Sequence, residues 1–226
     1  MPRNLVDQPV AIDRIVKEID ERMKKGILLI LMVLLCGCGT PESEKAVLES
    51  SQSEKADTAK LQEEETLWAV LDHDENTVGY LAEDDKNVVQ IKELIENHCN
   101  YVDNRSADNL PIEKEMQLYT EEFRTLLEES GYTESVQDMY KGNQLALEKK
   151  QILWCPNTFD EELKYGKITV DAQFLLTKGD EGYLKQHEMS LDTIYIEQRV
   201  YYLEKTDGNW KISNINKSAL DQYNPT

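Results

Sequence analysis

The sequence lacks the cysteine and histidine spacing of a metal-binding protein, and it is poor in basic residues. It has four cysteines and three histidines, with no Cys-x-x-Cys pair and no Cys/His group spaced as in a zinc site. Lysine and arginine number 25, against 44 aspartates and glutamates. A nucleic-acid-binding protein needs a basic surface. The sequence therefore predicts no zinc site, no cofactor and no nucleic-acid partner.

The apolar run at residues 27–35 is too short to cross a membrane. All nine residues are Leu, Ile, Met or Val, whereas a transmembrane helix needs about 20. Lys24 and Lys25 precede the run and small residues follow it, which is the order found in a secretory signal. We therefore interpret residues 23–37 as a signal peptide.

The end of this segment, Leu-Cys-Gly-Cys at residues 35–38, resembles the lipobox of bacterial lipoproteins. Cys36 stands where Ala or Ser is commoner. The resemblance implies cleavage after Gly37 and a diacylglyceryl group on Cys38. Two acyl chains provide the double signal that stable anchoring requires. It thus implies a protein anchored in the bilayer on the extracytoplasmic face of the cell membrane.

Residues 1–22 do not fit the start of a signal peptide, because they carry acids and bases together. A signal peptide begins with its basic region. We therefore expect translation to start at Met23 and residues 1–22 to be an upstream extension caused by a misplaced gene start.

Residues 38–65 are rich in Ser, Glu, Lys and Ala and hold few large apolar residues. Such a composition buries too little surface to offset its ordering entropy. We expect a flexible acidic tether with a reach of roughly 30 Å. Residues 38–226 carry 19 basic and 39 acidic residues, a formal charge of −20. This charge predicts a domain that stands off anionic lipid.

Residues 66–85 contain two short apolar runs around a polar turn, which predicts a β-hairpin. The turn also matches part of a calcium-binding loop. Thr77 stands where such a loop needs Gly, so the calcium interpretation is the weaker alternative. Its candidate ligands are Asp72, Asp74, Asn76 and Glu83.

Helical periodicity marks residues 87–103, a region that opens at Pro111, and residues 132–140. Asn87 is the expected cap of the first helix, and His98 flanks its apolar face as a packed core histidine. In the second region Thr120 is expected to restart the helix and Gly131 to end it.

Strand periodicity follows at residues 145–155, 165–177, 191–205 and 210–215. The third of these is apolar on both parities, as in a central strand covered on both sides. Residues 206–209 predict a tight turn before the last strand. The long sequential strands predict an α+β fold in which N-terminal helices pack on a strongly curved antiparallel sheet.

This element order resembles the NTF2-like (cystatin-like α+β) superfamily over residues 86–216. The final hairpin carries the likeness, with aromatic and apolar residues at 200–203, Asp207 and Gly208 in the turn, and Trp-Lys-Ile at 210–212. The resemblance implies a cone-shaped domain over residues 86–226, with a pocket at its wide end. Its members include isomerases, cyclases, dehydratases, binding domains and assembly scaffolds, so the fold alone does not give the function.

Two cysteines, Cys99 and Cys155, remain after the signal and the lipidated cysteine. An extracytoplasmic compartment permits disulfides. The sequence leaves open a Cys99–Cys155 disulfide and two buried thiols.

Catalysis in such a cone would need a general acid or base with a shifted pKa. The candidates are Asp171, His187, Glu197 and Tyr195. Asp171 lies on the polar parity of its strand, and His187 lies in a polar stretch that predicts a hairpin loop. Glu197 alternates with Arg199, which is typical of a surface ion pair. No catalytic dyad is visible, and we expect no enzyme.

The expected function is therefore that of a membrane-anchored lipoprotein whose non-catalytic domain binds a small apolar ligand or a protein partner. One alternative is a scaffold in a cell-envelope secretion or conjugation complex, and a second is a SnoaL-like isomerase or cyclase. A large apolar pocket would favour the small-ligand binder, whereas a filled cone with an exposed apolar sheet would favour the scaffold.

Overall fold

The computed structural model of the protein describes residues 67–223. The expected upstream extension, signal peptide, lipidated Cys38 and tether lie outside these residues. Among the described helices, none has the length and apolar content to span a bilayer.

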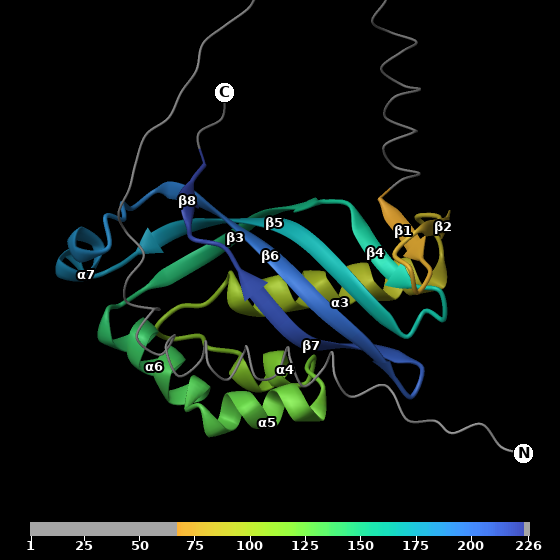
Figure 1. The fold of residues 1–226 in the computed structure, drawn as a ribbon. Helices are drawn as coiled ribbons and strands as arrows, with labels where there is room; N and C mark the ends of the chain where they lie inside the picture. The colour runs from red at the N-terminus through yellow and green to blue at the C-terminus, as the bar shows by residue number, and fades with distance from the viewer. Residues whose placement is uncertain (1–66, 224–226) are drawn as a thin grey trace, which may run out of the picture. The chain divides into compact units, whose positions relative to one another are not determined.

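The described chain is an α+β domain in which helices lie against one face of a curved sheet (Figure 1). The strands run in the order β2-β1-β4-β5-β6-β7, with β3 also beside β5 and β8 also beside β6. The strands are β1 Trp68–Leu71, β2 Thr77–Tyr80, β3 Ala146–Trp154, β4 Asn157–Asp160, β5 Tyr165–Lys178, β6 Thr193–Thr206, β7 Asn209–Lys217 and β8 Asp221–Gln222. The helices are α3 Lys86–Val102, α4 Ile112–Met116, α5 Glu121–Glu129, α6 Tyr132–Gly142 and α7 Glu181–Gln186.

The predicted helices are confirmed, but the cap of the first one is wrong. Asp85 is the N-cap of α3, and its carboxylate accepts a hydrogen bond from the Asn87 backbone N–H at 2.7 Å. The Asn87 side chain is taken by tertiary contacts instead, because its Oδ1 accepts from Trp210 Nε1 at 3.2 Å and from Lys205 Nζ at 2.6 Å. Thr120 caps α5 as predicted.

The sheet is mixed, so the expectation of an antiparallel sheet is wrong at one pair of strands, β1 and β4. The hairpin β1–β2 is confirmed, but β1 runs parallel to β4, with Trp68 opposite Asn157. The strand β4 was not predicted, and it follows directly after Pro156. The helix α7 replaces part of the hairpin loop expected around His187, because Asp180 caps the helix and Leu184 is buried.

The core lies between α3 and the inner face of the sheet, which is the face that α3 covers. Val88, Ile91, Ile95 and Cys99 of α3 are all fully buried. Alternation along the strands supplies the opposing side chains, which include Ile168, Val170, Tyr201, Leu203 and Ile212. Burying each large aliphatic side chain contributes about 1.5–3 kcal/mol, so this contact positions the helix.

The turn between β6 and β7 depends on left-handed backbone at two residues. Thr206 pairs with Asn209, and Asp207 and Gly208 between them have φ of 51° and 78°. These values fit a type I′ hairpin turn, which favours Asp-Gly. The predicted tight turn is confirmed.

We predict that Gly208→Ala lowers the free energy of unfolding by about 1 kcal/mol, because a Cβ disfavours the left-handed conformation. The matched control is Gly142→Ala at the end of α6, where the added Cβ also meets open space. It should leave stability unchanged or raise it by up to about 1 kcal/mol, because alanine favours helix. Urea denaturation of both variants checks this. Equal effects would contradict the assignment of the turn.

Candidate functional site

Polar side chains cross the interior between α3, α4 and the sheet in one connected set. We call this set the interior network. Its members are His98, Cys99, Asp103, Arg105, Glu115, Tyr119, Tyr132, Glu197, Arg199 and Tyr201. Seven of them are titratable groups no more than 3% exposed, namely His98, Cys99, Asp103, Arg105, Glu115, Arg199 and Tyr201.

One end of the interior network is a buried ion pair between α3 and β6. Arg199 donates from Nη1 to Asp103 Oδ2 at 2.9 Å and from Nη2 to Asp103 Oδ1 at 2.6 Å. Its Nε donates to Glu197 Oε2 at 2.6 Å, and Lys217 lies 3.3 Å from the same oxygen. Glu197 and Arg199 do pair, but the expected surface location is wrong for Arg199, whose side chain is 1% exposed.

The middle of the interior network is His98, held between two tyrosine hydroxyls. Its Nδ1 lies 3.0 Å from Tyr201 Oη, and its Nε2 lies 3.0 Å from Tyr119 Oη. Tyr201 Oη also lies 3.6 Å from Cys99 Sγ. The prediction that His98 is a packed core histidine is confirmed, since the residue is 1% exposed.

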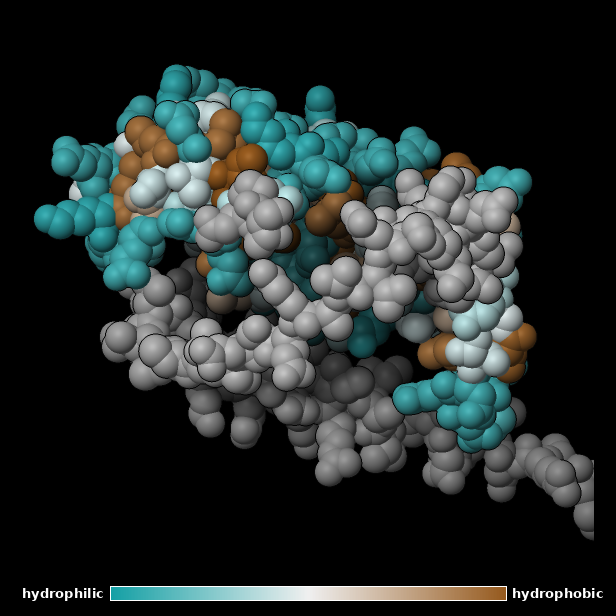
Figure 2. Space-filling model, turned by 90° about the horizontal axis from the view of Figure 1, so that it is seen from above, coloured by the Kyte–Doolittle hydropathy of each residue, from teal (hydrophilic) through white to brown (hydrophobic). Residues whose placement is uncertain are grey.

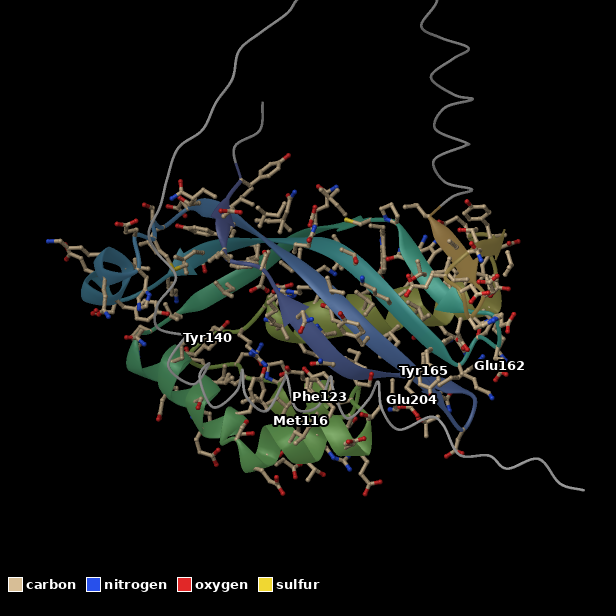
Figure 3. The ribbon with its side chains drawn as sticks, viewed as in Figure 1. Met116, Phe123, Tyr140, Glu162, Tyr165 and Glu204 are labelled. Carbon is tan, nitrogen blue, oxygen red and sulfur yellow. The ribbon has the colours of Figure 1, made fainter. Side chains whose placement is uncertain are left out.

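The other end is Glu115 on α4, which is fully surrounded by donors. Its Oε1 accepts hydrogen bonds from Tyr119 at 2.5 Å and from Tyr132 at 2.8 Å, and its Oε2 pairs with Arg105. Arg105 also donates to Tyr132 Oη at 3.1 Å. Met116 of α4, Phe123 of α5 and Tyr140 of α6 lie on the sides of their helices that face the sheet (Figure 3).

The donors and acceptors of this chain allow one consistent direction. Tyr119 donates to the Glu115 carboxylate, so its oxygen must accept from His98 Nε2–H. Neutral His98 then has a bare Nδ1, which accepts from the Tyr201 hydroxyl. Tyr201 is left to accept from the Cys99 thiol, whose sulfur accepts from Arg199 at 3.5 Å. The hydrogen bonds therefore assign the Nε2–H tautomer to His98.

The electrostatics of the site hold each group in this state. Burial lowers the pKa of His98 well below its ordinary value, and the positive charges of Arg199, Lys217 and Arg105 lower it further. Burial also raises the pKa of Tyr201. Burial alone would raise the pKa of Glu197, but Lys217 and Arg199 outweigh it, so this pKa is lowered. The histidine is thus neutral and the carboxylate of Glu197 ionised.

This arrangement can hold α3, α4 and β6 in fixed positions relative to one another. Both His98 nitrogens and both Glu115 oxygens are occupied by protein groups. Within the interior network, the buried side-chain atom that lacks a partner among the described residues is Arg105 Nε. Paired charges in a low-dielectric interior oppose any motion that would separate them.

The sheet face opposite α3 carries apolar side chains at intermediate exposure. They are Leu175, Ile194, Ile196 and Val200. Tyr202 and Leu153 are 37% exposed. Seen from above the view of Figure 1, the described surface has hydrophobic areas among hydrophilic ones (Figure 2). Tyr165 and Glu204 are cross-strand partners at one end of the sheet and lie close together (Figure 3).

The predicted catalytic candidates do not form one site. Asp171 accepts from Gln198 Nε2 at 3.1 Å, and the ring of His187 packs on Tyr183 with centroids 4.3 Å apart. Tyr195 Oη accepts from the Ser190 backbone N–H at 2.8 Å. Glu197 alone belongs to the interior network.

The candidate calcium ligands have different partners. Asp72 Oδ1 accepts from the backbone N–H groups of Asp74 and Asn76, both at 2.9 Å, which is the pattern of a polar turn. Glu83 lies elsewhere, bonded to Trp68 Nε1 at 2.6 Å and to Lys92. Among residues 67–223, no three His, Cys, Asp or Glu side chains are grouped to hold a metal ion.

Cys99 and Cys155 are both free thiols in this structure. Cys99 lies on the inner side, against Tyr201 and Arg199. Burial raises the pKa of the Cys155 thiol, and the charge of nearby Asp171 raises it further. Strand alternation puts Asp171 on the face opposite α3, so the sheet lies between the two sulfurs.

Sequence reasoning missed Glu115, Tyr119 and Tyr201 as partners of His98. A weak signal exists, because Glu115 and Tyr119 stand four residues apart, one turn along the chain. Comparison with protein-family models and with curated proteins found no match to this chain.

We predict that Arg199→Met destabilises the protein by about 3–5 kcal/mol, because it leaves Asp103 buried without its partner. The double variant Asp103→Leu/Arg199→Met should be more stable than Arg199→Met alone. Lys164→Met breaks the exposed pair with Glu162 and should change little. Urea denaturation gives all three values. A small loss of stability in Arg199→Met would show that the ion pair does not hold α3 on the sheet.

The histidine makes stability depend on pH. His98 stays neutral when folded, because its pKa is lowered, but binds a proton near its ordinary pKa of about 6.5 when unfolded. The unfolded state therefore binds more protons below about pH 6.5, and stability falls as pH falls, by at most about 1.4 kcal/mol per unit.

We predict that His98→Gln, which keeps a donor and an acceptor, is less stable than the wild-type protein at pH 7. Its free energy of unfolding should also fall less steeply between pH 7 and pH 5.5, because the variant lacks the proton that His98 takes up on unfolding. Denaturation midpoints across this range measure it. An unchanged slope would contradict the assignment.

Proposed function

We propose that this protein is a lipid-anchored, extracytoplasmic lipoprotein whose folded domain binds a partner protein and performs no catalysis. The lipobox-like residues 35–38, behind two lysines and nine apolar residues, support the anchor. In this proposal the domain stands off the bilayer on the acidic tether of residues 38–65.

We further propose that the domain is a divergent NTF2-like cone. Helices cover one face of a curved sheet, and β5, β6 and β7 form its long antiparallel part. The type I′ turn at Asp207 and Gly208 closes the hairpin on which the likeness rests. Two features depart from the expected pattern, namely the additional β1–β2 hairpin and the parallel pairing of β1 with β4.

The interior network is the observation that favours a protein partner over a small apolar ligand. It occupies the space between helices and sheet where an NTF2-like pocket would lie. A ligand entering there would separate Arg199 from Asp103 or displace the donors of Glu115. Leaving such charges buried and unpaired costs several kcal/mol, and contacts with an apolar ligand do not offset this cost.

The surface offers more to a partner than the interior does. Apolar side chains such as Tyr202 and Leu153 are exposed on the sheet face opposite α3. Large exposed apolar areas mark contact surfaces more often than isolated residues do. A place in a cell-envelope assembly is one form that such binding would take.

We predict that Cys38→Ala releases the protein from membranes in its native host, because no thiol remains to be acylated. Cys36→Ser is the matched control and should stay anchored, since serine suits that position of a lipobox. Membrane fractionation and intact mass of the extracted protein measure both. A Cys38→Ala chain that stays in membranes with unchanged lipid would contradict the anchor.

The same preparation tests the binding role. Photo-crosslinking of the anchored protein, with the reactive group at Tyr202, should give a discrete protein adduct that is reduced in Cys38→Ala. Organic extraction of the purified protein should yield no apolar molecule at one copy per chain. A stoichiometric apolar molecule without a protein adduct would overturn the proposed partner class.

A further inference from the structure

We propose that the edge strand β2 is the docking site for an extended, basic-flanked segment of the partner, which pairs with it as an additional strand. This inference rests on the protein-binding role proposed above and names the place and the chemistry of the contact. Its observations are independent of the interior network.

Two edge strands of the sheet, β7 and β2, differ in how they are covered. On β7, the connection between α4 and α5 covers the edge, since Thr120 N–H donates to Ile212 O at 2.9 Å and Ile212 N–H donates to Leu118 O at 3.0 Å. On the opposite edge, β2 pairs with β1 and with no other strand within residues 67–223. An open edge pairs readily with another extended segment.

The hydrogen bonds of the hairpin identify which backbone groups are open. Leu81 N–H donates to Trp68 O at 2.9 Å, and Val70 lies opposite Gly79. In an antiparallel pair the residue between two bonded residues turns its N–H and C=O away from the partner. Tyr80 therefore presents both backbone groups outward. Tyr80 is 52% exposed and Val78 is 58% exposed.

Of the devices that protect natural edges, β2 has a short length of four residues and a bulge, but neither lysine nor proline. Its sequence is Thr-Val-Gly-Tyr at residues 77–80. The register slips by one residue at Val78, which bends the strand there. An incoming segment would thus pair mainly around Tyr80, beside the exposed side chains of Tyr80 and Val78.

The charge around β2 identifies the occupant. Residues 67–85 contain six acids and no lysine or arginine. Asp72, Glu83 and Asp85 are engaged within the fold. The other three are exposed at the two ends of the strand, Asp74 and Glu75 before it and Asp84 after it. A segment with a basic residue at each end and small or β-branched residues between them fits this pattern.

A second copy of this chain does not fit. Antiparallel pairing of two β2 strands would place Asp74 and Glu75 of one chain beside Asp84 of the other. Like charges facing one another across strands destabilise the pair. The charge therefore favours a basic partner over self-association.

The test uses the detergent-solubilised full chain and a fluorescent peptide, Lys-Lys-Val-Thr-Val-Thr-Lys-Lys, with a glutamate-flanked peptide as its counterpart. We expect the lysine peptide to bind and to protect the Tyr80 amide from hydrogen exchange. Tyr80→Pro removes the outward N–H at an edge position where proline is tolerated. It should weaken binding about tenfold, whereas Tyr80→Thr, which keeps the N–H, should weaken it less than about threefold.

A charge variant keeps the test decisive if Tyr80→Pro disturbs the hairpin. Asp74→Asn/Glu75→Gln/Asp84→Asn should weaken the lysine peptide and flatten its salt dependence. Removing three exposed acids elsewhere, in Glu129→Gln/Asp138→Asn/Glu188→Gln, should leave its affinity nearly unchanged. Equal loss in both triple variants would mean non-specific adsorption and would overturn the proposal, as would equal binding of the glutamate peptide.

Failure here is distinguishable from failure of the proposed function. If the crosslinked protein adduct forms but is insensitive to Tyr80→Pro, the partner binds elsewhere and only the docking strand is wrong. If no protein adduct forms and the lysine peptide does not bind, both proposals fail. Dimerisation of the chain that is lost in Tyr80→Pro would overturn the basic partner.

Discussion

The fold depends on the buried pair between Arg199 and Asp103. An arginine with a 1% exposed side chain has to be paired, since an unpaired charge in the interior costs several kcal/mol. This requirement joins the end of α3 to the middle of β6. Once the two are joined, His98 lies one turn back on α3, between Tyr201 of β6 and Tyr119 beyond α4. Glu115 and Arg105 complete the set. The position of α3 on the sheet and the protonation state of His98 therefore depend on the same set of contacts.

The interior network also uses the polar groups between the helices and the sheet for contacts within the protein. Most buried side-chain polar atoms of the described domain are paired within the protein, so the proposed partner would contact exposed strands and side chains. The edge strands β7 and β2 also differ in how far other residues cover them. The edge at β7 is covered by the residues that link α4 to α5, whereas β2 lies between exposed acids. If the protein is anchored as proposed, the acidic composition of residues 38–65 and of the folded domain would favour a partner that carries positive charge.

Local pattern predicted most elements because it depends on neighbours in the chain. The 3.6-residue and two-residue periods located α3, α6 and the long strands within a few residues, and the turn at Asp207 and Gly208 needs only its own backbone angles. Predictions that depended on distant residues were less successful. Asn87 was expected to cap α3, but it accepts hydrogen bonds from Lys205 and Trp210 instead. Arg199 was expected at the surface because its neighbour Glu197 offered a partner, and the buried partner Asp103 is 96 residues away.

By itself the sequence determined the α+β class, the order of helices and strands, the acidic charge and the buried place of His98, because each follows from composition or short-range spacing. It also provides the signal-like segment and lipobox on which the proposed anchor rests. Only the tertiary structure decided that β1 pairs in parallel with β4, that two arginines lie in the interior, and that Glu115 and two tyrosines surround the histidine. The physical reason is that a buried charge or an unpaired strand edge is resolved by residues far along the chain, and their proximity is created by folding.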